Sequence, residues 1–136
     1  MLKAQTTYDW LETAPDGNWK QGAGGARWNP GGLWDEPPFG VIRFNNNHQL
    51  TMTNNVSGTY SQHKITFGSS NTQSRTINGN AVQLFDNSTI WPWIKNESTA
   101  THTIGFPLIG PTGSYNLELI ANAGSLVFTN TINNNA

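Results

Sequence analysis

The chain has 136 residues, no cysteine, seven basic and eight acidic side chains, and a formal net charge of −1. The lack of cysteine excludes a disulfide framework, a thiolate metal site and a cysteine nucleophile. The near-zero charge leaves no electrostatic footprint for nucleic acid, and no apolar run approaches the ~20 residues of a membrane-spanning helix. Asn, Thr, Ser and Gly fill 57 positions, whereas Leu, Ile, Val and Phe fill 28. This polar composition with a low net charge predicts a folded, neutral, all-β protein.

Residues 1–40 predict an N-terminal cap without long regular elements. They contain four of the six tryptophans, seven of the 14 glycines and four of the seven prolines. Because Gly and Pro interrupt helices and strands, we expect an irregular or short-stranded segment ordered by large aromatic rings. Residues 1–5 are too short and polar for a signal peptide, and no hydrophobic stretch follows them. This cap and a repeat region over residues 41–136 are expected to form one domain.

Residues 41–136 consist of short apolar segments separated by Asn, Gly, Ser and Thr. The segments are three to six residues long and rich in β-branched and aromatic residues, which is typical of β-strands. None has the 3.6-residue apolar period of a helix, so almost no helix is expected. The predicted strands are Val41–Phe44, Gln49–Met52, Lys64–Phe67, Thr76–Asn78, Ala81–Phe85, Thr101–Phe106, Asn116–Ile120 and Ser125–Thr129.

Five of these segments share an apolar–x–Phe ending, with phenylalanine at positions 44, 67, 85, 106 and 128. Spacings of 18 to 23 residues indicate a solenoid, in which stacked rungs build one core that no single rung could bury. We therefore expect a parallel β-helix of about four to five short rungs. Rows of Asn and Thr are expected to form hydrogen-bonded ladders at its turns. The alternative is a β-sandwich or jelly roll, in which a strand recurs about every 8–12 residues.

Several stretches carry the text of a known repeat family. Residues 64–84 contain Ile-Thr-Phe and then Thr-Ile-Asn-Gly-Asn-Ala-Val-Gln-Leu, and residues 94–104 end in His-Thr-Ile. Residues 107–128 add a Pro-Leu pair and Gly-Ser-Leu-Val-Phe. The opening of the chain adds Trp10, Trp19, Trp28, Pro37 and Val41–Phe44. Over most of its length the chain therefore resembles autotransporter-associated β-strand repeat proteins.

This resemblance implies a right-handed parallel β-helix and a secreted or surface-displayed bacterial module. Such modules serve in display, spacing or adhesion, at the cell surface or outside the cell, and the family carries no common catalytic residues. The sequence departs from the family because these residues include no translocator barrel and no long repeat array. It also has an unusual segment, Ile90–Ile94, where the family is plainer.

The residues that carry chemistry do not form a recognisable catalytic or metal-binding motif. His48, His63 and His102 lack the spacing of zinc ligands, and His102 falls on a repeat position that is expected to be structural. Asp35 and Glu36 are the best local pair of carboxylates. Neighbours in an extended segment point to opposite faces, however, and cannot easily form a glycosidase dyad. We therefore expect no enzyme activity, no catalytic residue, no metal and no cofactor.

Trp91, Pro92 and Trp93 form the sharpest candidate for a binding site. In an extended segment the two indole rings share a face, roughly 6–7 Å apart along the chain, and Pro92 keeps the segment extended. Flat aromatic rings stack on the C–H faces of sugars while polar neighbours bind the hydroxyl groups. Trp34 is a further candidate for the same ligand. The other interpretation is that these rings only cover the flank of the solenoid.

The expected partners follow from these features. Exposed tryptophans would favour a polysaccharide or a cell-surface glycan, whereas nucleic-acid binding and membrane insertion are not expected. Residues 130–136 begin like another repeat and then stop. Because the end of a β-helix exposes unpaired strand edges, we expect either neighbouring domains of a longer chain or end-to-end self-association.

Overall fold

A computed structural model describes residues 6–20, 25–31, 40–85, 91–111 and 116–133. These residues form fourteen β-strands in three sheets and no helix, so no described helix could cross a membrane. Sheet A contains, in spatial order, β12 (Glu118–Ala121), β9 (Trp93–Asn96), β6 (Lys64–Phe67), β3 (Val41–Phe44), β1 (Thr7–Trp10) and β2 (Trp28–Asn29). Sheet B contains β13 (Ser125–Phe128), β10 (Thr101–Ile104), β7 (Thr76–Gly79) and β4 (Thr51–Asn54). Sheet C contains β14 (Ile132–Asn133), β11 (Leu108–Ile109), β8 (Val82–Leu84) and β5 (Tyr60–Gln62).

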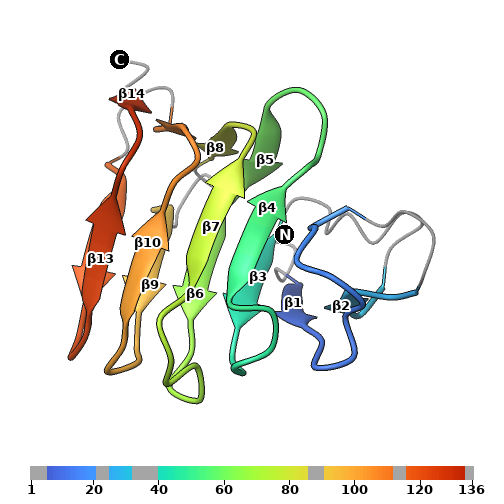
Figure 1. The fold of residues 1–136 in the computed structure, drawn as a ribbon. Coiled ribbons are helices and arrows are strands. Elements are labelled where there is room, and N and C mark those ends of the chain that lie inside the picture. Colours follow the sequence, from blue (N-terminus) through green and yellow to red (C-terminus); the bar gives the residue numbers. More distant parts are fainter. Residues whose placement is uncertain (1–5, 21–24, 32–39, 86–90, 112–115, 134–136) are drawn as a thin grey trace.

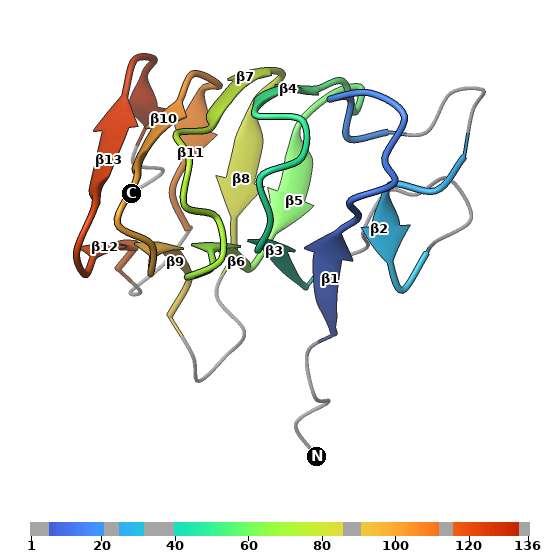
Figure 2. The same ribbon diagram turned by 60° about the horizontal axis from the view of Figure 1, so that its bottom comes forward.

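The described strands wind as a β-solenoid. Consecutive strands fall in sheets A, B and C in turn, and all pairings between these strands are parallel except that of β1 with β2. The chain completes three full turns from β3 to β12, and β12, β13 and β14 begin a fourth (Figures 1 and 2). The predicted all-β solenoid is thus confirmed. Parallel pairing rules out the alternative sandwich, because sandwich sheets are antiparallel.

The core is built from every second strand residue. In sheet A, Ile42 pairs in register with Ile65 and Ile65 with Ile94, and all three side chains are fully buried. The positions between them in β3 and β9 are only half-buried. This alternation follows because successive residues of a strand point to opposite faces. A four-residue strand therefore supplies two residues to the core, and a low aliphatic content is enough to fill it.

The rungs are longer than the phenylalanine spacing predicted. In sheet A, Lys64 follows its partner Val41 by 23 residues, Trp93 follows Lys64 by 29, and Glu118 follows Trp93 by 25. Of the five aligned phenylalanines, only those at positions 44 and 67 share a column. The other three lie in or just after strands of sheets B and C. The corners between sheets differ in length, so a single sequence period does not describe the rungs.

Buried asparagines close the corners between sheets. Asn54, the last residue of β4, donates from Nδ2 to the carbonyl of Asn80 in the next rung at 2.8 Å. Asn96, the last residue of β9, donates to the carbonyls of Ala100 and Ser125 at 2.8 and 3.0 Å. Both asparagines are fully buried. Side-chain amides thus connect successive rungs at the turns, as predicted from the asparagine content.

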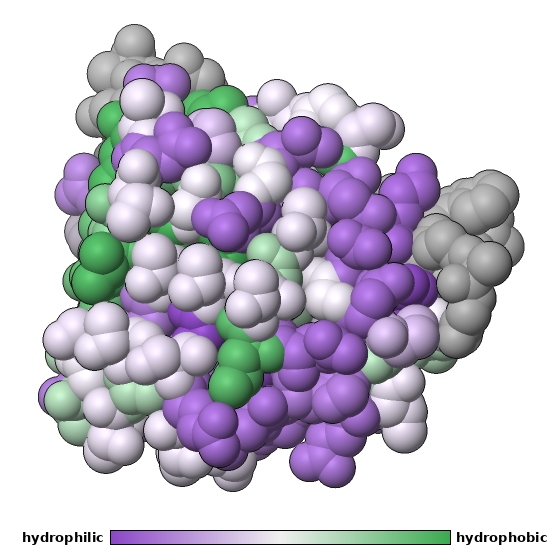
Figure 3. All heavy atoms as spheres, viewed as in Figure 1, coloured by the Kyte–Doolittle hydropathy of each residue, from purple (hydrophilic) through white to green (hydrophobic). Residues whose placement is uncertain are grey.

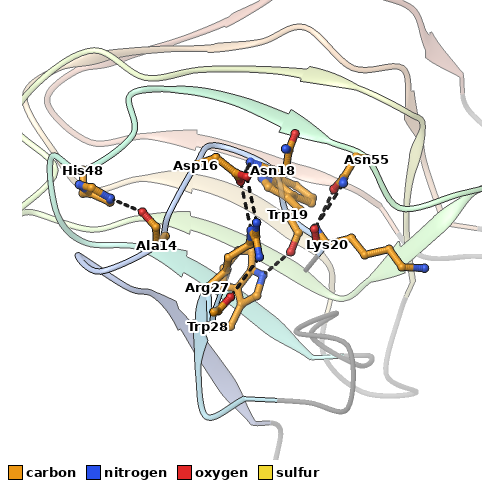
Figure 4. Close-up of polar contacts among 10 residues, drawn as sticks. Ala14, Asp16, Asn18, Trp19, Lys20, Arg27, Trp28, His48 and Asn55 are labelled. Atoms are coloured by element: carbon orange, nitrogen blue, oxygen red, sulfur yellow. Dashed lines mark hydrogen bonds and ion pairs between the residues drawn. The ribbon is translucent and has the colours of Figure 1, made fainter. Parts of the chain in front are cut away.

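Three tryptophans seal the N-terminal end of the solenoid. Trp10, Trp19 and Trp28 are at most 2% exposed. The Trp28 ring centroid lies 5.1 Å from that of Trp10, 6.1 Å from that of Trp19 and 5.6 Å from that of Phe44 in the first rung. Nε1 of Trp28 donates to the Trp19 carbonyl at 3.0 Å (Figure 4). The cap and the first rung therefore share one hydrophobic core.

Polar contacts hold the cap loop against this core (Figure 4). The buried Arg27 donates to Asp16 from Nε and Nη2 at 3.2 and 2.9 Å, and this pairing lowers the pKa of Asp16. Nε2 of His48 lies 2.6 Å from the carbonyl oxygen of Ala14. The backbone N–H of Lys20 donates to the Asn55 side chain at 2.7 Å. The loop before β2 is thus bonded to the first rung at two separate points, through His48 and Asn55.

Candidate functional site on the outer face of sheet A

The outer face of sheet A carries the predicted tryptophan pair. Burial alternates from Trp91 to Asn96, so Pro92 and Ile94 are buried while Trp91 and Trp93 are on the outer side. Trp91 is 43% exposed, whereas Trp93 in β9 is half-buried. The spacing of two residues therefore brings both side chains to one face of the chain. Trp34, the third candidate, lies outside the described residues.

Lys64 occupies one side of the Trp93 ring. Lys64 in β6 pairs in register with Trp93, and its Nζ lies 3.6 Å from the ring centroid in a cation–π contact. Burial lowers the pKa of Lys64, and the Glu118 carboxylate opposes this shift. Nε1 of Trp93 donates to Thr66 Oγ1 at 3.4 Å. Trp93 is thereby fixed against the sheet, and Trp91 is the more accessible ring of the pair.

Charged side chains of both signs lie around these rings. Nζ of Lys95 is 5.8 Å from the Trp93 ring centroid and 3.3 Å from the Glu97 carboxylate. On an earlier strand, Arg43 donates from Nη2 to Asp9 Oδ2 at 2.8 Å, and the Asp9 carboxylate raises the pKa of Arg43. Positive and negative groups are thus interleaved along the face. Such a surface offers donors and acceptors to a polar ligand without a net field of either sign.

A buried serine–histidine pair lies inside the solenoid. Ser98 Oγ is 2.8 Å from His102 Nε2, and the backbone N–H of Arg75 donates to His102 Nδ1 at 3.1 Å. Because a backbone N–H only donates, Nδ1 carries the lone pair and the ring proton sits on Nε2. The imidazole therefore donates to Ser98, whose hydroxyl donates to Asn96 Oδ1 at 2.9 Å. A nucleophilic pair requires the reverse, with histidine accepting the serine proton.

The surroundings of His102 are those of a structural residue. Its ring is fully buried and stacks on Phe67 with the ring centroids 4.3 Å apart. Burial, with the positive charge of Arg75 nearby, lowers the pKa of His102 to about 4. The imidazole is therefore neutral near pH 7 and is built into the corner after β9.

Sequence reasoning missed Arg75, which holds the preceding corner from within. Its guanidinium is fully buried and donates to Asn71 Oδ1 at 2.9 Å and to the carbonyls of Asn46, His48 and Gln49 at 2.6 to 3.0 Å. Burial lowers the pKa of Arg75 to about 10. The only signal in the sequence is one arginine directly before an apolar strand, a position that is usually exposed to solvent.

The described residues contain no group of three His, Cys, Asp or Glu side chains that could hold a metal ion. Asp9 and Asp16 each bind an arginine instead. Asp35 and Glu36, the neighbouring carboxylates of the sequence, lie outside the described residues.

Comparisons with known proteins add no relative: no family model, curated protein or solved structure matches the chain. The class of protein is therefore defined by its fold, a parallel β-solenoid closed at one end by tryptophans. Its candidate site is the aromatic and charged outer face of sheet A.

Proposed function

We propose that this chain is a non-catalytic bacterial module that acts outside the cell in display, spacing or adhesion. The observation that carries the proposal is how the interior uses its reactive side chains. Ser98, His102 and Arg75 are buried, and their polar groups bond to one another's corners instead of facing a ligand. Contact with other molecules is left to the outer faces of the sheets. The repeat text of residues 64–84 supports the bacterial, extracellular setting.

The packing suits a module that holds other groups apart. Each rung adds ~4.8 Å along the solenoid axis and is bonded to its neighbours in three sheets at once. Bending such a stack in any direction strains the hydrogen bonds of at least one sheet. A stiff module of this kind presents whatever is attached to it at a fixed distance and angle.

Carbohydrate binding is the second candidate function, and Trp91 is the observation that favours it. An indole ring that is 43% exposed sits on the same side of the chain as Trp93, Lys95 and Glu97. Sugar recognition uses this combination of an accessible ring and nearby donors and acceptors. The ligand of such a face would be a polysaccharide or a cell-surface glycan.

One pull-down experiment separates the two functions. The purified chain is incubated with a panel of insoluble polysaccharides and immobilised glycans, and the bound fraction is measured. Binding through the candidate site predicts that Trp91→Ala weakens retention roughly tenfold, and Trp93→Ala similarly, as expected for about 1.4 kcal/mol of stacking. The matched control is Val127→Ala, because Val127 is 40% exposed on sheet B. Retention that all three variants share equally would move the site elsewhere.

A second measurement tests the non-catalytic and adhesive parts of the proposal. The same polysaccharides are assayed for new reducing ends after long incubation, and their release by the wild-type chain would contradict a non-catalytic function. Bacterial cells that display the chain on a surface anchor are then compared with cells that carry the anchor alone. Adhesion requires that only the first cells attach to glycan-coated surfaces, whereas equal attachment leaves display and spacing.

A further inference from the structure

The terminal rung, defined as β12, β13 and β14 with their connections (residues 116–133), leaves the core open. Leu119 stands in register with Ile94, and Ile132 with Leu108. The two residues of the preceding rung are fully buried, whereas Leu119 and Ile132 are 45% and 46% exposed. The other partly buried apolar residues that pack here are Leu117, Leu126 and Phe128. In Figure 3 much of the hydrophobic surface lies along the left edge, where Figure 1 places the strands of this rung.

The backbone of the terminal rung also has open edges. Among the described residues, β12 pairs only with β9, β13 only with β10 and β14 only with β11. The N–H groups of Glu118 and Asn122 donate to carbonyls of the preceding rung. Residues that alternate with them, Leu119 and Ala121, therefore turn their N–H and C=O groups to the open side. The end of the solenoid thus presents three strand edges around an apolar centre.

The residues of this rung do not protect these edges. Natural edge strands are usually blunted by lysine, proline or inward-pointing charges. Residues 116–133 contain no lysine, arginine or proline, and Glu118 is their only charged residue. The outer position of Glu118, paired in register with Trp93, keeps its carboxylate off the end face. A partner that meets the end face encounters no charge.

The opposite end of the solenoid is closed. Trp10, Trp19 and Trp28 are buried there, and the antiparallel strand β2 occupies the outer edge of sheet A. The two ends of the described chain therefore differ in kind. A second copy finds the apolar, open edges at one end and not at the other.

We propose that the terminal rung is the interface of a symmetric dimer, in which a second copy of this chain contributes its own terminal rung. Another open rung of the same cross-section is the one surface that offers strand edges to three sheets at once. A two-fold axis perpendicular to the solenoid axis runs the apposed strands antiparallel and covers Leu119 and Ile132. Antiparallel pairing about the middle of β12 sets the two Glu118 side chains at opposite ends of the paired strands, so the carboxylates do not face each other.

The test is the molar mass of the full chain over a wide concentration range, by sedimentation equilibrium. The expected result is a reversible dimer. Leu119→Lys and Ile132→Lys are each expected to weaken dimerisation by at least about tenfold, because they place a charge on the buried end face. Val127→Lys is the matched control. Val127 lies in the same rung and is 40% exposed, but it alternates with the inward Leu126 and Phe128 and so points away from the interface.

Each other outcome overturns the proposal. A monomer at every concentration shows that the open rung does not recruit a second copy. A mass that grows beyond the dimer shows head-to-tail stacking, and equal loss in Val127→Lys moves the contact to a flank. Circular dichroism of each variant shows whether it is folded. Should Leu119→Lys unfold, Ile132→Lys in the two-residue strand β14 carries the test.

Discussion

Ser98 Oγ and His102 Nε2 lie 2.8 Å apart, and the proton between them belongs to the imidazole. The other ring nitrogen accepts the backbone N–H of Arg75. A second ring proton would therefore point at that N–H donor in a fully buried site. The arrangement that excludes nucleophilic catalysis also makes this corner sensitive to acid.

We expect the free energy of unfolding to fall as the pH decreases from about 6.5 to about 4. The pKa of His102 is about 4 in the folded chain, against a model value of 6.5. Between these values the unfolded state binds a proton that the folded state does not, so this stabilisation is complete above the higher pKa and is lost on acidification. The full change corresponds to about 3 kcal/mol. Urea unfolding across this pH range measures it.

The control for the acid effect is His102→Gln. This variant is expected to be less stable than the wild type at neutral pH, because glutamine does not reproduce both ring contacts. It should also lose most of the dependence on pH between the two pKa values. Equal pH slopes for the wild type and the variant would contradict the assignment to His102.

Arg75→Met should destabilise the chain by roughly 3–5 kcal/mol. Methionine keeps much of the apolar volume but leaves Asn71 and the carbonyls of Asn46, His48 and Gln49 without their donor. The matched control is Arg43→Met, which breaks a solvent-accessible ion pair with Asp9 and is expected to cost less than about 1 kcal/mol. Chemical denaturation of both variants compares them. A similar cost for both would mean that the buried guanidinium does not hold the corner.

Gly79→Ala and Gly58→Ala should differ strongly, although both glycines have positive φ values of 112° and 76°. A Cβ on Gly79 would lie 2.3 Å from the backbone oxygen of Asn54, whereas a Cβ on Gly58 meets nothing within 4 Å. Gly58→Ala carries only the conformational cost of about 1–2 kcal/mol. Gly79→Ala adds a clash with the neighbouring rung, and we expect a loss of more than about 3 kcal/mol. Thermal unfolding of the two variants decides, and equal melting temperatures would refute the clash.

Trp19→Ala should cost roughly 3–5 kcal/mol, because the ring is fully buried and contacts Trp28, Phe44 and Phe106. Trp91→Ala removes an exposed ring and should change the free energy of unfolding by no more than about 0.5 kcal/mol. Guanidinium unfolding followed by circular dichroism compares the two. A large loss in Trp91→Ala would show that this ring supports the fold instead of standing free for a ligand.

The sequence predicted most of the strands that have plain apolar alternation. Val41–Phe44 and Lys64–Phe67 match β3 and β6 residue for residue. The prediction missed β5, β9, β11 and β14. β5 places the polar Gln62 at an inward position, and β11 and β14 have only two residues each. Polar residues inside the solenoid hide the alternation on which strand prediction depends.

The candidate site was predictable only within one strand. The placement of Trp91 and Trp93 on one side follows from their spacing of two residues. The contact of Lys64 with Trp93 did not follow, because it spans a rung of 29 residues whereas the preceding rung in sheet A spans 23. Register between rungs depends on corner length, and corners are set by buried groups such as Arg75 that carry no periodic signal.

The closed aromatic end has a consequence for the order in which the chain folds. Residues 6–31 and β3 leave the ribosome first, and they complete a template before the later rungs are synthesised. Each new rung then docks on the one before it, with contacts that span about one rung of sequence. Translation and folding can therefore advance in step, and the rung that is made last is the one that stays open.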